Sequence, residues 1–246
     1  MRQFGLIGYP LSHSFSKKYF TEKFERENIP QANYELYPLP TIDAFPKLLE
    51  EQSQLIGLNV TIPYKQVVIP FLDKLDDSAQ KVGAVNVIKI ENGQKIGFNS
   101  DYYGFKQSLL NSQFPINKNF KALVLGSGGA SKAIIAALQD LSIDYKIVSR
   151  NPTNDQQIAY ESITQTLIAH YRLIVNTTPL GMHPHVEACP ALPYQEMNEN
   201  YLLFDLVYNP AETLFLKKGA NQGAQTLNGL EMLHLQAEKS WEIWNR

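Results

Sequence analysis

The segment Leu123-Val124-Leu125-Gly126-Ser127-Gly128-Gly129-Ala130-Ser131 determines how the second half of this chain folds. The apolar run 121–125 predicts a buried strand, and 130–141 has the composition of a strong helix. Glycines between a strand and a helix permit a tight turn and a close approach of the backbone to a ligand, and the first N–H groups of the helix face an anion. The segment therefore favours a dinucleotide-binding turn. A plain glycine-rich turn is the alternative, because Ser131 stands where a third Gly or Ala is common.

The end of the next predicted strand indicates which nucleotide this turn binds. An NAD site places a carboxylate there, about twenty residues after the glycines, to bind the ribose hydroxyls. Here the residues are Val148-Ser149-Arg150-Asn151, without a carboxylate. A guanidinium matches the geometry of a phosphate, so Arg150 favours the 2′-phosphate of NADP. Taken alone, such an arginine is usually a solvated surface charge, and no second arginine follows within the next several residues.

Strands and helices alternate on both sides of the glycine turn, which predicts an α/β fold. We expect an N-terminal α/β domain with a mixed sheet over residues 1–101, to which a C-terminal helix over 231–246 returns, and a Rossmann-type domain over 102–230. The polar, proline-containing segment 111–119 lies near the boundary. Asn92-Gly93 predicts a hairpin turn. The expected strands are Gln3–Gly8, Tyr34–Tyr37, Leu55–Thr61, Ala84–Ile90, Gln94–Phe98, Lys121–Leu125, Tyr145–Ser149, Leu173–Asn176 and Tyr201–Val207. The expected helices are Ser16–Asn28, Ile42–Glu51, Tyr102–Leu110, Ala130–Leu141, Gln156–His170 and Glu231–Trp244.

Composition excludes several classes of protein. A net charge of −2 gives no reason to expect nucleic acid or an anionic membrane as a partner. A single cysteine, Cys189, cannot form an internal disulfide. The first residues, MRQFGLIGYP, are typical of a first strand rather than a signal peptide. His183 and His185 lack the neighbours that would complete a metal-ligand set, so we expect no metal. These features predict a cytoplasmic protein, which we expect to be a monomer or a homodimer.

Polar residues recur at four places in the first hundred residues. Ser14 and Ser16 lie at the start of a predicted helix and could bind a small carboxylate, but for this segment alone an N-cap at Ser16 within a polar loop is the favoured explanation. Lys65 and Asp101 each follow a predicted strand, and Asn86 lies near the start of another. Individually, such residues are ordinary turn residues or surface charges. As a set, they are more informative than any one of them alone.

Eight segments in a fixed order carry a resemblance that spans essentially the whole chain. They are Gly-Tyr-Pro-Leu-Ser-His-Ser-Phe-Ser (8–16), Asn-Val-Thr-Ile-Pro-Tyr-Lys (59–65), Gly-Ala-Val-Asn (83–86), Gly-Phe-Asn-Ser-Asp (97–101), Gly-Ser-Gly-Gly-Ala (126–130), Asn-Thr-Thr-Pro-Leu-Gly-Met (176–182), Asp-Leu-Val-Tyr-Asn-Pro (205–210) and Gly-Leu-Glu-Met-Leu-His-Leu-Gln-Ala (229–237). In this order they resemble the shikimate dehydrogenase family. The departures are Val87 and Ser100, where the family has threonine, Lys17 in place of a frequent proline, and Asn151-Pro152 after Arg150.

The resemblance implies the reversible, NADPH-dependent reduction of 3-dehydroshikimate to shikimate in chorismate and aromatic amino acid biosynthesis. It implies that Lys65 and Asp101 are the catalytic pair and leaves open which of them is the formal proton donor. The implied substrate-binding residues are Ser14, Ser16, Thr61, Lys65, Asn86, Asp101, Tyr208 and Gln236. The implied cofactor-binding residues are Gly126, Ser127, Gly128, Gly129, Ala130, Ser149, Arg150, Thr177 and Gly229. The alternatives are a quinate/shikimate dehydrogenase with broader substrate or NAD use, and a non-catalytic sensor of pathway metabolites.

Overall fold

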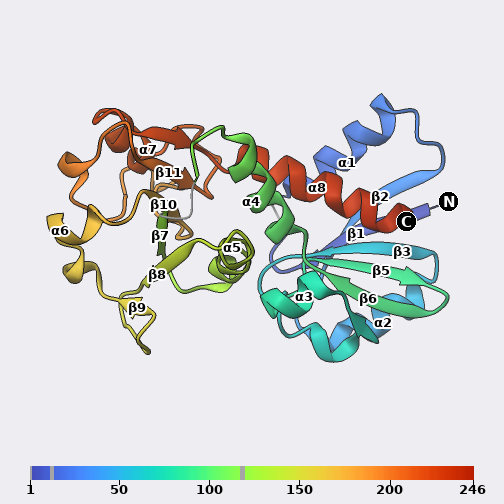
Figure 1. The fold of residues 1–246 in the computed structure, drawn as a ribbon. Coiled ribbons are helices and arrows are strands. Elements are labelled where there is room, and N and C mark those ends of the chain that lie inside the picture. Colours follow the sequence, from blue (N-terminus) through green and yellow to red (C-terminus); the bar gives the residue numbers. More distant parts are fainter. Residues whose placement is uncertain (1, 12–13, 117–119) are drawn as a thin grey trace. The chain divides into compact units, whose positions relative to one another are not determined.

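Residues 2–11, 14–116 and 120–246 are described by the computed structural model, which is drawn as a ribbon in Figure 1. Ser12 and His13 of the first motif lie outside the described residues. The chain divides into two compact units. The first unit comprises Met1–Ser100 and Ala237–Arg246, and the second comprises Asp101–Gln236. The division therefore falls inside two helices, α4 (Ser100–Asn111) and α8 (Leu230–Asn245).

The first unit is built on a mixed six-stranded sheet in the order β2-β1-β3-β5-β6-β4. β1 pairs in parallel with β2 and β3, whereas β5 is antiparallel to both β3 and β6. The β5–β6 hairpin closes through Asn92 and Gly93, whose φ angles of 51° and 76° suit a tight hairpin turn. The strands are β1 (Arg2–Gly8), β2 (Ala32–Pro38), β3 (Leu55–Val60), β4 (Lys74–Leu75), β5 (Val87–Glu91) and β6 (Gln94–Phe98). The helices are α1 (Phe15–Arg26), α2 (Phe45–Glu51) and α3 (Asp77–Val82).

Aromatic side chains form the core on one side of this sheet. Phe4 and Tyr34 from the sheet, Phe20 from α1 and Trp244 from α8 belong to one buried cluster. Gly57 in β3 allows the indole of Trp244 to lie directly on the backbone, because a Cβ at Gly57 would lie 2.5 Å from the Trp244 ring. The last turns of the chain therefore complete the core of the first unit.

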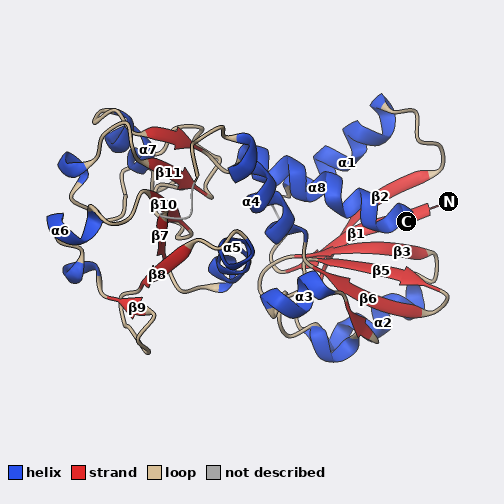
Figure 2. Cartoon of the chain, viewed as in Figure 1, coloured by secondary structure: helices blue, strands red, loops and turns tan. Residues whose placement is uncertain are grey.

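The second unit contains a fully parallel sheet in the order β12-β11-β10-β7-β8-β9. Alternate residues of β7 face different clusters: Ala122 and Val124 join one, and Leu123 and Leu125 join the other. The strand is therefore buried on both faces, as parallel strands covered by helices are. Figure 2 shows the helices and strands by colour. The strands are β7 (Lys121–Leu125), β8 (Asp144–Val148), β9 (Gln157–Ile158), β10 (Leu173–Asn176), β11 (Leu202–Asp205) and β12 (Gln225–Leu227), and the further helices are α5 (Gly129–Asp140), α6 (Gln165–Ile168) and α7 (Leu214–Ala220).

The predicted α/β fold with one mixed sheet and one Rossmann-type sheet is confirmed, and the strand order is that of a doubly wound dinucleotide-binding sheet. The predicted helix over Gln156–His170 is wrong. The segment instead forms β9, a 3₁₀ turn over Tyr160–Ser162 and the single-turn α6. Its first residues are held by the sheet, because Ile158 pairs with Val148, and α6 starts only where Thr164 caps it. Helices α3 and α7 and strands β4 and β12 were not anticipated from the sequence pattern.

Candidate functional site

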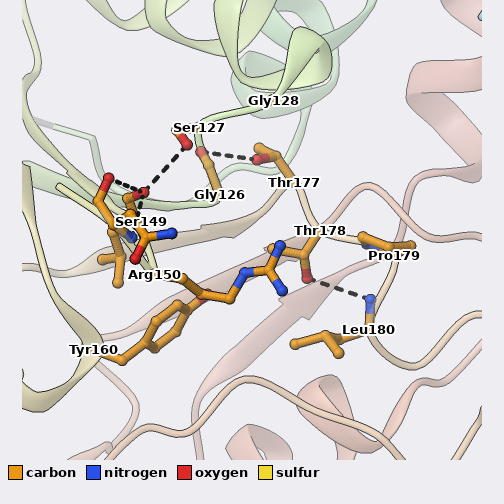
Figure 3. A pocket seen from close by; sticks show the side chains of 12 residues that line it. Gly126, Ser127, Gly128, Ser149, Arg150, Tyr160, Thr177, Thr178, Pro179 and Leu180 are labelled. Atoms are coloured by element: carbon orange, nitrogen blue, oxygen red, sulfur yellow. Dashed lines mark hydrogen bonds between the residues drawn. The ribbon is translucent and has the colours of Figure 1, made fainter. Parts of the chain in front are cut away.

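A cavity of about 540 Å³ lies at the carboxyl ends of β7, β8 and β10 in the second unit (Figure 3). β7 is the first strand of the doubly wound sheet, and the chain order reverses on either side of it. Ligands of such sheets bind at this switch point, outside the carboxyl ends of the strands. The lining residues are Gly126, Ser127, Gly128, Val148, Ser149, Arg150, Asn151, Tyr160, Thr177, Thr178, Pro179 and Leu180.

The glycine turn leaves room for a ligand at the start of α5. Gly126 has a φ of +104°, and a Cβ there would lie 2.9 Å from the Thr177 hydroxyl. Gly128 is the N-cap of α5 and no side chain caps the helix, while a Cβ built on Gly128 or Gly129 would meet nothing within 4 Å. The uncapped N–H groups can therefore bind a pyrophosphate. The residue that departs from the usual glycine pattern, Ser131, is buried and donates its hydroxyl to the Gly128 carbonyl at 2.7 Å.

The other end of the cavity carries a positive charge. Arg150 directly follows β8, and its exposed side chain extends into the cavity (Figure 3). The Ser149 hydroxyl lies 3.3 Å from that of Ser127 and accepts a hydrogen bond from the Asn151 N–H at 3.3 Å. No aspartate or glutamate is among the described residues that line the cavity. This arrangement suits a phosphate better than a ribose diol.

A buried polar cluster holds the third segment that lines the cavity, which follows β10. Asn176, at the end of β10, donates to Asp205 at 2.9 Å and accepts from the Thr178 N–H at 3.1 Å and the Thr178 hydroxyl at 2.6 Å. Asp205 also accepts from the Thr213 hydroxyl at 2.5 Å and the Val207 N–H at 3.0 Å. Burial raises the pKa of Asp205 to about 6, although these three hydrogen bonds lower it. The cluster holds the backbone of the segment 177–180, which lines the cavity.

Six of the nine predicted cofactor residues line the cavity: Gly126, Ser127, Gly128, Ser149, Arg150 and Thr177. Gly129 and Ala130 follow in the first turn of α5 and are not among the lining residues. Gly229 is not among them either, and a Cβ there would lie 2.1 Å from the Leu206 carbonyl oxygen. The sequence analysis missed Tyr160, which lines the cavity, because it placed that residue inside a helix.

The two candidate serines of the first unit lie at the start of α1. Ser14, rather than Ser16, is the N-cap, and its hydroxyl accepts from the Lys17 N–H at 3.4 Å. Ser16 forms a side-chain hydrogen bond with the hydroxyl of Tyr34. Both serines are half-buried. The capping alternative therefore applies to Ser14, and Ser16 belongs to a larger network.

That network consists of buried polar side chains from β2, β3, α8, the start of α4 and the residue before β5. The Tyr34 hydroxyl donates to Asn59 at 2.8 Å, and the Asn59 amide donates to the Ser240 hydroxyl at 3.0 Å. The hydroxyls of Ser240 and Ser100 lie 3.2 Å apart. Asn86 donates to the Ser100 hydroxyl at 3.0 Å and accepts from the Ser100 N–H. The network thus joins residues from four sequence motifs, and its members Tyr34 and Ser240 were missed because they lie outside those motifs.

Thr61 and Lys65 lie on the segment that follows β3. The Thr61 N–H donates to the Ile7 carbonyl at 2.9 Å, and a Cβ on Gly8 would lie 2.3 Å from the Thr61 methyl group. The Lys65 carbonyl accepts from the Val85 N–H at 2.6 Å. Both side chains are half-buried. Thr61 and Lys65 are therefore held at the carboxyl end of the parallel strands β1 and β3.

Three candidates belong to the second unit. Asp101 lies in the first turn of α4, three residues before Gly104 and so on the same face of the helix. A Cβ on Gly104 would lie 2.7 Å from the Met232 carbonyl and 3.1 Å from Gln236 Cβ, so α4 and α8 pack closely there. Tyr208 follows β11 and is 39 % exposed. Asp101 and Gln236 thus lie on two helices in close contact.

The parallel sheet, its glycine turn and the cavity beside them define a dinucleotide-binding Rossmann unit, joined to a second α/β unit with its own mixed sheet. Among the described residues, no helix is long and apolar enough to cross a membrane. Residues 6–88 match the family model described as the shikimate dehydrogenase substrate binding domain.

Similar proteins cover nearly the full length of the chain. A protein of Clostridium beijerinckii named shikimate dehydrogenase (NADP(+)) is 40 % identical over 252 residues, which is 99 % of this chain and 92 % of that protein. A crystal structure of shikimate 5-dehydrogenase from Thermus thermophilus in complex with NADP(H) and shikimate has a TM-score of 0.85 at 30 % identity, covering 99 % of this chain and 93 % of the other. That of the Listeria monocytogenes enzyme with shikimate and NAD has a TM-score of 0.90 at 27 % identity and covers 100 % and 92 %. The chain belongs to the shikimate dehydrogenase family.

Proposed function

We propose that this chain catalyses the reversible, NADPH-dependent reduction of 3-dehydroshikimate to shikimate in aromatic amino acid biosynthesis. The observation that carries the proposal is a nucleotide cavity with an arginine and no carboxylate among its lining residues, in a chain 40 % identical to an NADP-dependent shikimate dehydrogenase. The polar candidate residues are of the kinds that bind a small, hydroxylated acid. We further propose that the protein works in the cytoplasm and is a monomer or a homodimer. Sedimentation of the pure protein tests the oligomeric state.

The nucleotide fits the residues of the second unit. Its pyrophosphate would lie on the uncapped start of α5, where the open space beside Gly128 and Gly129 accepts a ligand. Ser149 and Arg150 would hold the adenosine end, and Thr177 would lie beside the glycine turn to which its hydroxyl is bonded. Ala130 and Gly229 would contribute backbone rather than side-chain contacts. When bound, NADPH supplies the hydride that reduces the ring ketone.

Lys65 and Asp101 are the proposed catalytic residues. Reduction of a ketone leaves an alkoxide that must receive a proton, and an ammonium group beside the oxygen stabilises the developing charge and can donate that proton. Asp101 would orient the amine and share the proton.

The remaining candidates would bind the hydroxylated ring acid. Ser14 and Ser16, at the start of α1, would donate their hydroxyls to its carboxylate, because a helix start offers hydroxyls and N–H groups to an anion. Thr61, Asn86, Tyr208 and Gln236 would bond ring hydroxyls. Unpaired polar groups in such a site would penalise analogues that lack a hydroxyl.

The test is turnover of the purified chain, followed as reduction of NADP⁺ in the presence of shikimate. We expect shikimate with NADP⁺ to be the preferred pair over quinate and over NAD⁺. Lys65→Ala should lower kcat by at least about 10²-fold while shikimate binding changes only a few-fold. The matched control is Lys47→Ala, at an exposed lysine of α2.

Three results would contradict the proposal. Efficient oxidation of quinate with NAD⁺ would favour a quinate/shikimate dehydrogenase with broader use of substrate and cofactor. Binding of shikimate and NADP⁺ without any turnover would favour a metabolite sensor. Near-normal turnover by the Lys65→Ala variant would remove Lys65 from the mechanism.

A further inference from the structure

Tyr160 lies at the adenosine end of the nucleotide cavity. It starts the 3₁₀ turn Tyr160–Ser162 that follows β9, and its ring packs on the buried cluster of Leu123, Val148 and Ile168. The side chain is half-buried and lines the cavity together with Arg150. Figure 3 shows the two side chains at the same end of the cavity, away from the glycine turn. Tyr160 is therefore an aromatic residue that packs on the core and lines the cavity together with the cation proposed to bind the 2′-phosphate.

The Tyr160 hydroxyl is available to a ligand. No residue in the described part of the chain forms a hydrogen bond with it, and it is not a buried, unsatisfied group. Burial raises the pKa of Tyr160 above 10.0, and the positive charge of Arg150 offsets only part of that rise. The phenol is therefore protonated at neutral pH and can donate a hydrogen bond.

A 2′-phosphate at this end carries more negative charge than Arg150 alone neutralises, and it has acceptor oxygens for further donors. Such a phosphate carries close to two negative charges and three terminal oxygens. Arg150 is the single cation among the described residues that line the cavity. The Ser149 hydroxyl is already bonded to its own turn, where it lies 3.2 Å from the Asn151 carbonyl. Tyr160 thus presents a side-chain donor from a second residue at the end of the cavity that Arg150 lines.

We propose that Tyr160 determines selectivity for NADP over NAD by donating its hydroxyl to the adenosine 2′-phosphate that Arg150 neutralises. This inference rests on the proposed function, because it assigns a residue to the cofactor site of the same enzyme. It explains how the chain can bind the phosphate without a second arginine after Arg150. The aromatic ring supplies the position, and the hydroxyl supplies the discrimination.

The experiment is calorimetric titration of the full chain and its Tyr160→Phe variant with NADP⁺ and NAD⁺. The ring is retained in this variant, so packing is preserved and only the donor is lost. A hydrogen bond to a charged group predicts an about tenfold weaker binding of NADP⁺, with NAD⁺ unchanged. Adenosine 2′,5′-bisphosphate and adenosine 5′-monophosphate should show the same contrast. The matched control is Tyr171→Phe, a buried tyrosine of the same cluster that is not among the residues lining the cavity.

Two outcomes would overturn the inference. Equal losses for NADP⁺ and NAD⁺ would make Tyr160 a packing residue, and unchanged binding of both would remove it from the site. Thermal melting of each variant separates these outcomes from a folding defect. If NADP⁺ binds with the predicted contrast but shikimate is not oxidised, the proposed function fails while the assignment of Tyr160 stands.

Discussion

Replacing Asp205 by asparagine is expected to remove a pH dependence from the stability of the second unit. Asp205 is fully buried, and its pKa is raised from the ordinary 3.8 to about 6. The folded state therefore binds the proton more tightly than the unfolded state. The contribution of the Asp205 proton to the free energy of unfolding is complete below pH 3.8. It falls as the pH rises from 3.8 to about 6, and it is lost above about pH 6.

The magnitude follows from the size of the shift. A rise from 3.8 to about 6 corresponds to about 3 kcal/mol in total, at about 1.4 kcal/mol for each pH unit. About 1.3 kcal/mol of this falls between roughly pH 5 and 7. In Asp205→Asn, the amide oxygen can still accept from Asn176 and Val207, and the hydroxyl of Thr213 can rotate to accept from the new NH₂ group. The variant should therefore be more stable than the parent at pH 7 and lack this pH dependence.

Denaturant unfolding of the full chain between pH 5 and 8 is the assay. Both tryptophans, Trp241 and Trp244, belong to the first unit, so their fluorescence serves as an internal reference. Hydrogen exchange of peptides from β10 and β11 reports on the surroundings of Asp205. The reasoning is refuted if the variant shows the same loss of protection from pH 5 to 7 as the parent. A less stable variant at pH 7 would show that the carboxylate is the favoured form.

Three further predictions concern single residues. Arg150→Ala should raise KM for NADP⁺ at least about tenfold and leave KM for NAD⁺ nearly unchanged, as steady-state kinetics would show; equal changes would disprove a phosphate role. Gly126→Ala should destabilise the chain by about 1–3 kcal/mol and weaken NADP⁺ binding in a titration, because of its φ of +104° and the close Thr177 hydroxyl; an undisturbed Tm and Kd would contradict this. Asn59→Ala should lower the free energy of unfolding by about 1–3 kcal/mol, since the buried Tyr34 hydroxyl loses its acceptor; denaturant titration against Asn33→Ala, at a half-buried position, is the check.

The sequence pattern predicted the secondary structure correctly where hydrophobic periodicity and a motif agreed. The strand Lys121–Leu125 was predicted with its observed ends, because an apolar run is closed by glycines whose geometry is specific. The helix expected over Gln156–His170 failed because its apolar residues serve three short elements, and pairing of Ile158 with Val148 overrides local preference. Tyr160 was lost as a site residue for the same reason.

Long-range polar contacts could not be predicted from the sequence pattern either. Asn59 and Asn86 stand in recognisable motifs, but nothing in the sequence indicates that Tyr34 and Ser240 complete their hydrogen bonds. Pairings between residues 181 positions apart are set by tertiary packing. The same holds for Ser14, whose role as the N-cap in place of Ser16 depends on where α1 begins.

The N-terminal unit is not closed by its own first hundred residues, because Trp244 lies on Gly57 and packs with Phe4 and Phe20. During synthesis, the core of this unit therefore stays incomplete until Trp244 has been made. The core of the Rossmann unit draws on the first turn of the same helix, through Met232. A product truncated before α8 would thus leave the aromatic surface of the first unit uncovered, and chaperones bind such surfaces.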